Sequence, residues 1–291
     1  TNPFNDPYFD YQWHYHNTAP KDGYVAGADI NLLKAWNLET GDESVIVAIT
    51  DAGVDYLHED LAGAMWVNEA ELNGTPGVDD DNNEYVDDVY GYNFAVPDGS
   101  NNMIGTIKPE DHGTHVAGTV GAINNNGKFG AGIAGGNGVK KGVRLMSCQT
   151  ISGNNGSYIQ LAFVYAADNG AVISQNSWSL LNATSTPSYL IDAMDYFRAY
   201  AGIDENGNQV GPMAGGVIIF AAGNDNTSQA YPSMYDGVIA VASTGPSGSK
   251  ASYSNFGNWV DISAPGGENG AQPYGNVYST IPGNEFGQMS G

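Results

Sequence analysis

Short apolar segments rich in β-branched residues alternate along the chain with longer helix-like segments, and this alternation constrains the fold more than any other feature. Each apolar segment is continuous, which is typical of strands that are buried on both faces of a sheet. The alternation predicts an α/β fold in which helices cover both faces of a mostly parallel central sheet. Strands are expected at 44–50, 142–147, 171–176, 216–221 and 237–242, and helices at 112–124, 157–168 and 187–201.

Asp51 ends the first of these apolar segments. In open parallel sheets, ligands bind beyond the carboxyl ends of the strands. Asp51 and the sequence AAGN at 221–224 both fall at such ends. By its position alone, Asp51 is better explained as a turn residue or a helix cap.

The sequence EDHGTHVAGTV at 110–120 contains two histidines at the start of the helix expected over 112–124. They allow two chemical interpretations. In the first, His112 is a general base whose tautomer and charged form are supported by Asp51. In the second, His112, His115 and an aspartate ligate a metal. The spacing of the two histidines permits a metal, but no further His or Cys lies in a convincing position to complete the ligand shell.

Asn224 ends the apolar segment GGVIIFAAGN, where its side-chain amide could point into the same crevice as Asp51 and His112. An acyl-transfer enzyme needs donors aimed at the oxyanion of its tetrahedral intermediate, and an asparagine amide is suitable. Together with Asp51 and His112, this residue favours acyl transfer over an ordinary Gly-Asn turn.

Motifs over nearly the whole chain resemble the subtilisin-like serine proteases, or subtilases, with the first 60 residues most similar to thermitase-like members. Asp comes first and His second, and the nucleophile is expected last, which is the order of that family. The matching sequences are NDPYFDYQW at 5–13, AITDAGVDYLHEDL around Asp51, HGTHVAGTV around His112, VISQNSWS at 172–179, FAAGN at 220–224, YSNFGNWVDISAPG at 253–266 and YSTIPGNEFGQMSG at 278–291.

The resemblance implies a subtilisin-like three-layer fold, hydrolysis of peptide bonds through an acyl-enzyme, and a role for each matching residue. Asp51 would orient and charge His112, His112 would be the general base and acid, Asn224 would donate to the oxyanion, and His115 would only pack. Polypeptide substrates would bind in extended conformation by strand addition. One wall of the substrate site would be Ser177, Trp178 and Ser179, and the other Ala221, Ala222 and Gly223.

Three positions depart from the family pattern. Ala52 replaces the usual Ser or Thr after the aspartate, which removes a local hydrogen bond, and Ser179 stands where a Gly is usual, which would narrow the pocket or make it more polar. The pattern also continues beyond Gly291 with Thr and the nucleophilic Ser, so Ser290 is not the nucleophile.

Residues 1–291 are therefore expected to be a single catalytic domain that lacks its nucleophile segment and following helices, and to be inactive alone. The expected partners, besides substrates, are the remaining C-terminal segment of the domain or a propeptide. The alternative is an inactive fragment or pseudo-protease that serves as a calcium-binding or interaction domain.

Structural Ca²⁺ is the expected cofactor. Six acids fall within residues 79–88, where they would repel one another unless a cation or solvent relieves them. Asp79, Asp81, Asn83 and Asp87 have the spacing of an oxygen-ligand loop, although Glu84 replaces the glycine of an EF-hand. The resemblance implies a second, thermitase-like site that is formed by Asp6, Asp60, the Ile123 carbonyl and Asn125.

Charge and composition limit the remaining possibilities. Nine basic residues against 32 acidic ones give a net charge of −23, which repels nucleic acid and anionic lipid and suits a secreted or cell-surface protein. No apolar stretch reaches the roughly 18 residues of a membrane span. The single cysteine, Cys148, excludes an internal disulfide and is expected in the core.

Overall fold

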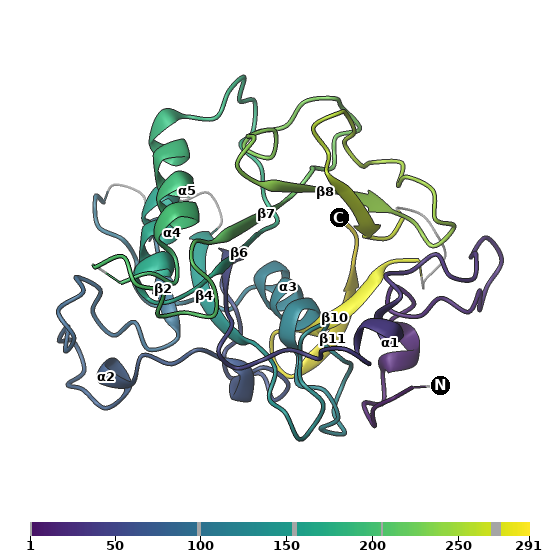
Figure 1. Cartoon of the computed structure of the whole chain (residues 1–291), viewed down its shortest axis with the longest axis horizontal. Helices are drawn as coiled ribbons and strands as arrows, with labels where there is room; N and C mark the ends of the chain where they lie inside the picture. The colour runs from purple at the N-terminus through teal and green to yellow at the C-terminus, as the bar shows by residue number, and fades with distance from the viewer. Residues whose placement is uncertain (1, 98–99, 153–155, 205, 269–274) are drawn as a thin grey trace.

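The computed structural model of the chain describes residues 2–97, 100–152, 156–204, 206–268 and 275–291. Within these ranges, seven strands form one parallel sheet in the order β2-β4-β1-β6-β7-β8-β9 (Figure 1). The α/β fold with a mostly parallel central sheet is therefore confirmed. In sheet order, the strands are β2 (Gly91–Asn93), β4 (Arg144–Ile151), β1 (Ile46–Ala52), β6 (Ile173–Asn176), β7 (Val217–Ala221), β8 (Ile239–Thr244) and β9 (Ile262–Pro265).

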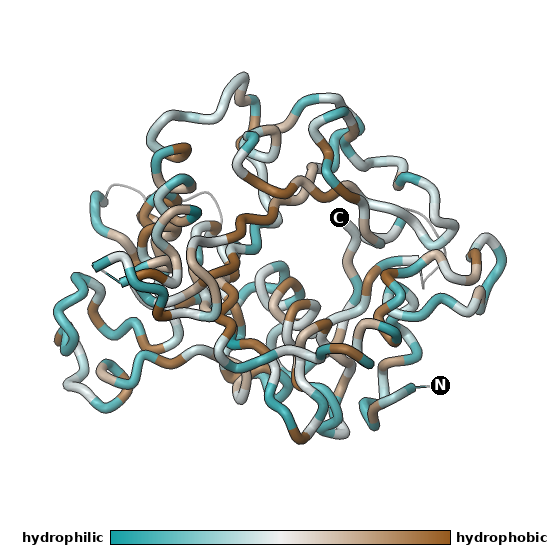
Figure 2. Tube along the Cα trace, viewed as in Figure 1, coloured by the Kyte–Doolittle hydropathy of each residue, from teal (hydrophilic) through white to brown (hydrophobic). Residues whose placement is uncertain are grey.

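Helices cover both faces of the sheet, as predicted. Ala48 of β1 packs in the core under α4 (Ile159–Asp168) and α5 (Ser188–Tyr200). Its neighbours Val47 and Ile49 point to the opposite face and pack in the core under α3 (Asp111–Gly121). Figure 1 shows α4 and α5 side by side on one side of the sheet and α3 on the other. The most hydrophobic segments follow the strands, and the hydrophilic ones lie in the outer loops (Figure 2).

β1 lies at the point where the chain changes direction across the sheet. Its two neighbours are β4 and β6, so the chain passes from one side of β1 to the other between these strands. In open parallel sheets, such a switch point forms a crevice at the carboxyl ends of the strands. Asp51 is the penultimate residue of β1 and therefore lies at this crevice.

An antiparallel hairpin and several short elements complete the described fold. The hairpin β10 (Val277–Ile281) and β11 (Glu285–Met289) packs against α3, where a Cβ at Gly118 would lie only 2.1 Å from Thr280 Oγ1. The N-terminal segment has its own apolar cluster, with Phe9 and Tyr15 at its centre. The short elements are η1 (Phe9–Tyr11), α1 (Leu32–Ala35), η2 (Ala62–Ala64), α2 (Glu69–Leu72), β3 (Ala95–Val96) and β5 (Gly156–Ser157).

The five predicted strands and three predicted helices are all present, with shifted ends, whereas β2, β9, the hairpin and the short elements were not predicted. The helix predicted over 112–124 ends at Gly121, because Ala122 adopts an extended ψ of 140° and Ile123 N–H then donates to the Asp60 carbonyl at 3.0 Å. Cys148 is fully buried in the core, as expected. In the described ranges, no helix has both the length and the apolar character needed to cross a bilayer.

Candidate active site

Asp51 and His112 are in direct polar contact in the crevice. His112 Nδ1 lies 2.6 Å from Asp51 Oδ1, and the Ala52 N–H donates to the same oxygen at 2.6 Å. Asp51 is fully buried, whereas the His112 side chain is 51% exposed. A buried carboxylate thus holds one nitrogen of an accessible imidazole and leaves the other nitrogen for chemistry.

The other carboxylate oxygen of Asp51 shows the effect of the departure at Ala52. Asp51 Oδ2 is buried and has no hydrogen-bond partner among the described residues. The Ala52 side chain is a methyl group and cannot supply a donor. The carboxylate therefore interacts mainly through the oxygen that faces His112.

The contact depends on how closely α3 approaches the end of β1. Gly113 lies against this strand end, and a Cβ at this position would fall 1.9 Å from the Ala52 carbonyl oxygen. Only a residue without a side chain fits there, so Gly113 lets the first turn of α3 bring His112 to Asp51.

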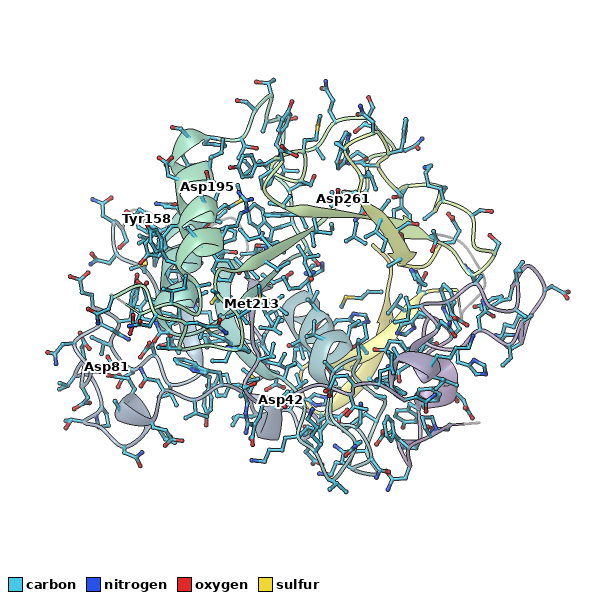
Figure 3. All side chains as sticks on the ribbon, viewed as in Figure 1. Asp42, Asp81, Tyr158, Asp195, Met213 and Asp261 are labelled. Atoms are coloured by element: carbon cyan, nitrogen blue, oxygen red, sulfur yellow. The ribbon has the colours of Figure 1, made fainter. Side chains whose placement is uncertain are left out.

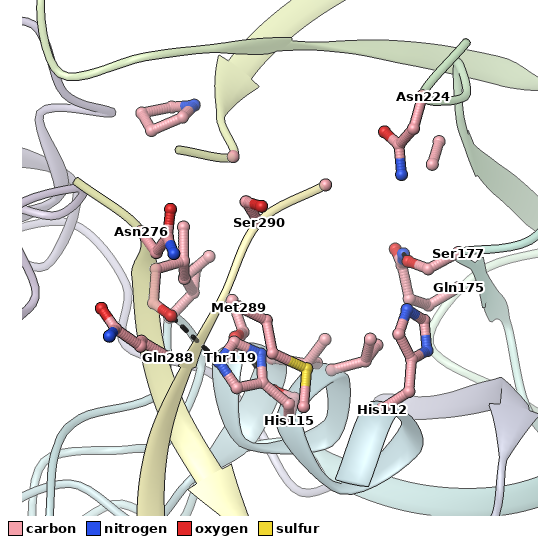
Figure 4. Close-up of a pocket in the computed structure, with 18 residues that line it drawn as sticks. His112, His115, Thr119, Gln175, Ser177, Asn224, Asn276, Gln288, Met289 and Ser290 are labelled. Atoms are coloured by element: carbon pink, nitrogen blue, oxygen red, sulfur yellow. Dashed lines mark hydrogen bonds between the residues drawn. The ribbon is translucent and has the colours of Figure 1, made fainter. Parts of the chain in front are cut away.

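The two histidines of α3 have different electrostatic environments. The hydrogen bond that His112 donates to Asp51 raises the pKa of His112, against the opposing effect of burial. Burial lowers the pKa of His115 to about 4, and its Nε2 lies 3.0 Å from the Val277 carbonyl (Figure 4). His115 is therefore a neutral side chain that ties α3 to β10, while His112 is poised to accept a proton.

The described residues of this crevice do not form the metal-ligand cluster that the second interpretation of His112 and His115 requires. His112 Nδ1 is engaged by Asp51 and His115 Nε2 by a backbone carbonyl. Among the described residues, the one group of three or more potential ligand side chains that lie together contains neither histidine.

Asn224 faces His112 across a cavity of about 630 Å³. Figure 4 shows the Asn224 amide and the His112 imidazole projecting into this cavity, with Ser177 between them in the view. Gly291 also lines it, and a Cβ built on Gly291 would lie 3.5 Å from Asn224 Nδ2. The cavity thus brings together an imidazole, a side-chain amide and Gly291.

The residues expected to line the substrate site are only partly brought together. Ser177 lines one cavity of about 170 Å³ together with Ala221, Ala222 and Gly223, because β6 pairs with β7 directly before these residues. Ser179 lies instead in a separate pocket of about 420 Å³.

Trp178 turns away from the cavity and into the sheet. Its Nε1–H donates to the Thr50 carbonyl at 2.9 Å, and its ring packs edge-on against Phe220. The pairing of β1 with β6 ends at Ile49 and Gln175, one residue before Thr50. The indole therefore bonds to a carbonyl that β6 leaves unpaired. The side chain braces the strand that carries Asp51.

The acidic loop gathers a different set of carboxylates from the one that its spacing suggests. Potential ligand atoms of Glu71, Asp81 and Asp88 lie within 4.8 Å of one another. Asp88 is fully buried, burial raises its pKa, and Tyr165 donates to it at 2.6 Å. Figure 3 places Asp81 at the rim of the molecule beside α2, away from the central cavity. Glu71 and Asp88 were not predicted as ligands.

The remaining members of the expected loop set have other partners. Asp79 accepts the backbone N–H of Asn83 and Glu84, and Asp87 accepts that of Gly77. The Asn83 amide nitrogen lies near both Asp81, at 3.2 Å, and Asp88, at 3.1 Å, so this residue belongs to the observed cluster.

Asp6 and Asp60 form a second acidic pair, and both are buried. Asp6 accepts the N–H groups of Asn125 and Asn126 at 2.8 and 3.1 Å. Burial, together with the nearby Asp6 charge, raises the pKa of Asp60 to about 8. Asp60 Oδ2 has no hydrogen-bond partner among the described residues, which is the condition that a bound cation would relieve.

Ile123 and Asn125, the other ligands expected at this second calcium site, lie near the two aspartates, but the Asn125 side chain has another partner. The Ile123 N–H donates to the Asp60 carbonyl, so the chain at this position passes beside the pair. The Asn125 side chain instead accepts from the Asn5 N–H at 3.2 Å, whereas the Asn126 amide donates to Asp60 Oδ1 at 2.6 Å. Asn126 was not predicted as a member of this site.

Comparison with known proteins agrees with the order and geometry of these residues. Residues 42–291 match the model of the subtilase family. The chain is 32% identical to a thermophilic serine proteinase of Bacillus sp. (strain AK1), over 94% of this chain and 56% of the relative. It is 31% identical to thermitase of Thermoactinomyces vulgaris, over 99% of this chain and 79% of the relative.

A solved structure described as proteases from Pseudoalteromonas arctica PAMC 21717 superimposes with a TM-score of 0.73 and 26% identity, over 100% of this chain and 82% of the other. The chain spans only about half the length of the Bacillus relative, 56%. The family model, the relatives and the fold agree, and the chain belongs to the subtilase family.

Proposed function

We propose that this chain is the main part of a calcium-stabilised serine endopeptidase that hydrolyses peptide bonds through an Asp-His-Ser triad. The observation that carries the proposal is the 2.6 Å contact between buried Asp51 and accessible His112, opposite the amide of Asn224. This arrangement supplies an oriented base and an oxyanion donor on two sides of one cavity, as acyl transfer requires.

In the proposed mechanism, a serine beyond Gly291 attacks the peptide carbonyl while His112 Nε2 takes its proton. Asp51 holds His112 Nδ1 and stabilises the imidazolium, and the Asn224 amide donates to the oxyanion. His112 then protonates the leaving amine, and water hydrolyses the acyl-enzyme by the same proton route in reverse.

The position of Gly291 supports a nucleophile that follows it. Gly291 lines the cavity that contains His112 and Asn224, so the next residues of a longer chain would enter this space. A segment there would also pack on the apolar side chains that line the cavity, including Val116 and Val120 of α3. The proposed partner of this surface is the C-terminal remainder of the same domain.

A serine-directed phosphonate tests the proposed chemistry. A form that continues past Gly291 with Thr and Ser should gain the mass of one phosphonyl group, should lose peptidase activity on labelling, and should lose labelling when that Ser is replaced by Ala. The 291-residue chain should not be labelled. Activity that needs zinc and survives the phosphonate would refute the proposal, and the absence of any activity would favour an inactive calcium-binding or interaction domain.

Polypeptides in extended conformation are the proposed substrates. Ser177 lies just beyond the end of β6, next to the cavity wall formed by Ala221, Ala222 and Gly223. Backbone groups at a strand end can pair with an extended chain and place little demand on its sequence.

Calcium is the proposed structural ion, at the cluster of Glu71, Asp81 and Asp88 and at the pair of Asp6 and Asp60. All these ligands are hard oxygens, which suit Ca²⁺. Sites of this kind remain filled where calcium is abundant, so we place the protein outside the cell, in agreement with its acidic surface.

The activity should depend on pH through His112. Because Asp51 raises the pKa of His112, and the base acts only when neutral, kcat/KM should fall as the pH drops through a value above 6.5. Asp51→Asn should move this inflection of the kcat/KM profile to lower pH, since the amide no longer stabilises the imidazolium. An inflection that is unchanged in Asp51→Asn would assign it to another group.

Calcium removal should destabilise the chain. At a calcium concentration 100 times the Kd, one site contributes about 2.7 kcal/mol, so EDTA should lower Tm by several degrees. Without calcium, the raised pKa of Asp60 predicts stability that is present below its unfolded value of 3.8 and is lost as the pH rises to about 8. Saturating calcium should remove this loss.

Calorimetry of single variants would separate the two sites. Asp60→Asn and Asp88→Asn should each reduce the calcium-dependent gain in Tm, whereas exposed Asp236→Asn should leave it intact. A Tm that EDTA does not change would contradict both proposed sites.

A further inference from the structure

Asn255 is a fully buried side chain that binds the loop carrying Asn224. Its Oδ1 accepts the backbone N–H of Asp225 and that of Thr227, each at 3.0 Å. Its Nδ2 donates to the Ala222 carbonyl at 2.9 Å. One amide therefore satisfies backbone groups on both sides of Asn224.

The loop is shaped around this amide. Gly223 has a φ of +104°, and a Cβ at this position would lie 2.4 Å from Asn255 Nδ2. The Asn255 N–H also donates to the Gly223 carbonyl at 2.9 Å. Glycine at position 223 therefore serves two purposes. It adopts the positive φ that the loop needs, and it leaves room for the Asn255 side chain.

The segment around Asn255 adds further ties to the same loop. The Asn226 N–H donates to the Tyr253 carbonyl at 2.7 Å, and the Phe256 N–H donates to the Thr227 carbonyl at 3.0 Å. Lys250 Nζ reaches Asn226 Oδ1 at 3.0 Å. The loop has left β7, which ends at Ala221, so residues 250–256 replace the sheet as its support.

We propose that Asn255 is the positioning residue for the oxyanion donor Asn224, an inference that rests on the proposed peptidase function. A donor stabilises the transition state only if it is already aimed at the place where charge develops. Asn224 is exposed to the cavity, and Asn255 fixes the backbone before and after it. Asn255 acts on the reaction through Asn224 and does not touch substrate itself.

A double-mutant cycle in a form that continues past Gly291 with Thr and Ser tests this role. Asn255→Ala should lower kcat by about 10- to 100-fold with KM nearly constant, because a misaimed catalytic group can cost about 10²-fold. Asn224→Ala should lower kcat by about 10²- to 10³-fold. Adding Asn255→Ala to Asn224→Ala should produce almost no further loss.

Asn93→Ala is the matched control, because Asn93 is also fully buried and its amide also bonds to backbone on two sides, at Thr106 and Ala95. It should lower Tm while kcat stays within about twofold of the unmodified enzyme, the change expected of a purely structural loss. If Asn255→Ala lowers kcat equally with and without Asn224, or behaves like Asn93→Ala, the positioning role is wrong. If Asn224→Ala leaves kcat unchanged, the proposed oxyanion role fails instead.

Hydrogen exchange covers the case in which Asn255→Ala does not fold. Asn255→Ser in the 291-residue chain keeps a hydroxyl that can accept one N–H but loses the donor to Ala222. The amides of Asp225 and Thr227 should then exchange at least about tenfold faster, while those of β1 and β4 stay protected. Unchanged exchange at both amides would overturn the inference.

Discussion

Replacing His112 with alanine is expected to lower kcat for peptide hydrolysis by about 10⁶-fold in a form that continues past Gly291 with Thr and Ser. This magnitude is the one measured for the corresponding loss in subtilisin itself. Without His112, the nucleophile keeps its proton and the leaving amine gains none, so only the oxyanion donor and substrate binding remain. Single-turnover hydrolysis of a fluorogenic peptide would measure the residual rate.

Two further variants test whether the loss of activity comes from the Asp51–His112 pair. Asp51→Asn preserves the shape of the buried side chain, and kcat should fall by about 10⁴-fold, because the amide fixes the wrong imidazole tautomer. Exposed His16→Ala should leave the rate unchanged. Circular dichroism would show whether His112→Ala still folds. If the variant loses its fold together with its activity, the result does not support a catalytic role.

The fold and the positions of Asp51 and Asn224 could be predicted because they depend on strand ends. The carboxyl ends of adjacent parallel strands lie at one edge of the sheet, so finding β1 and β7 placed Asp51 and Asn224 there. The family motif around His112 then pointed to α3. The close approach at Gly113 could not be predicted, because it depends on how α3 packs on β1.

The ligands of the acidic loop could not be predicted from spacing, because the loop path is irregular. Asn82, Glu84 and Asp87 have φ values of 60°, 76° and 55°, a left-handed conformation that non-glycine residues seldom adopt. These turns direct Asp87 to a backbone N–H and bring in Glu71 from α2. The spacing of ligands along the sequence predicts a site only when all the ligands come from one regular loop. It cannot identify a ligand that a separate helix supplies.

The expected substrate-site residues Ser177, Trp178 and Ser179 also could not be placed from the sequence, because they follow the end of a strand. Assigning Ser177, Trp178 and Ser179 together to one wall assumes that all three face the substrate, but β6 ends at Asn176 and the chain after it is no longer a strand. Beyond that point, Trp178 turns to the Thr50 carbonyl and Ser179 enters another pocket. The hairpin was not predicted for a different reason, since β10 and β11 mix polar with apolar residues and lack the continuous apolar run of the central strands.

Gly113→Ala is expected to reduce both stability and catalysis. The new Cβ would fall 1.9 Å from the Ala52 carbonyl oxygen, which belongs to β1 and has little freedom to move. Overpacking of this kind typically costs about 1–3 kcal/mol, and a backbone clash belongs at the upper end, so the free energy of unfolding should fall by about 3 kcal/mol. Relief of the clash moves α3 away from β1 and opens the 2.6 Å contact of His112 with Asp51, so kcat should fall by about 10²-fold.

Gly121→Ala in the same helix is the matched control, because its Cβ would meet only the ends of the Leu145 and Val143 side chains, at 3.2 Å. Those side chains can adjust, and alanine favours a helix over glycine by up to about 1 kcal/mol, so urea unfolding should show a change within about 1 kcal/mol. If both variants lose equal stability, the cost comes from the helix itself and not from the contact with β1. A stable, fully active Gly113→Ala would show that His112 reaches Asp51 without the close approach of α3.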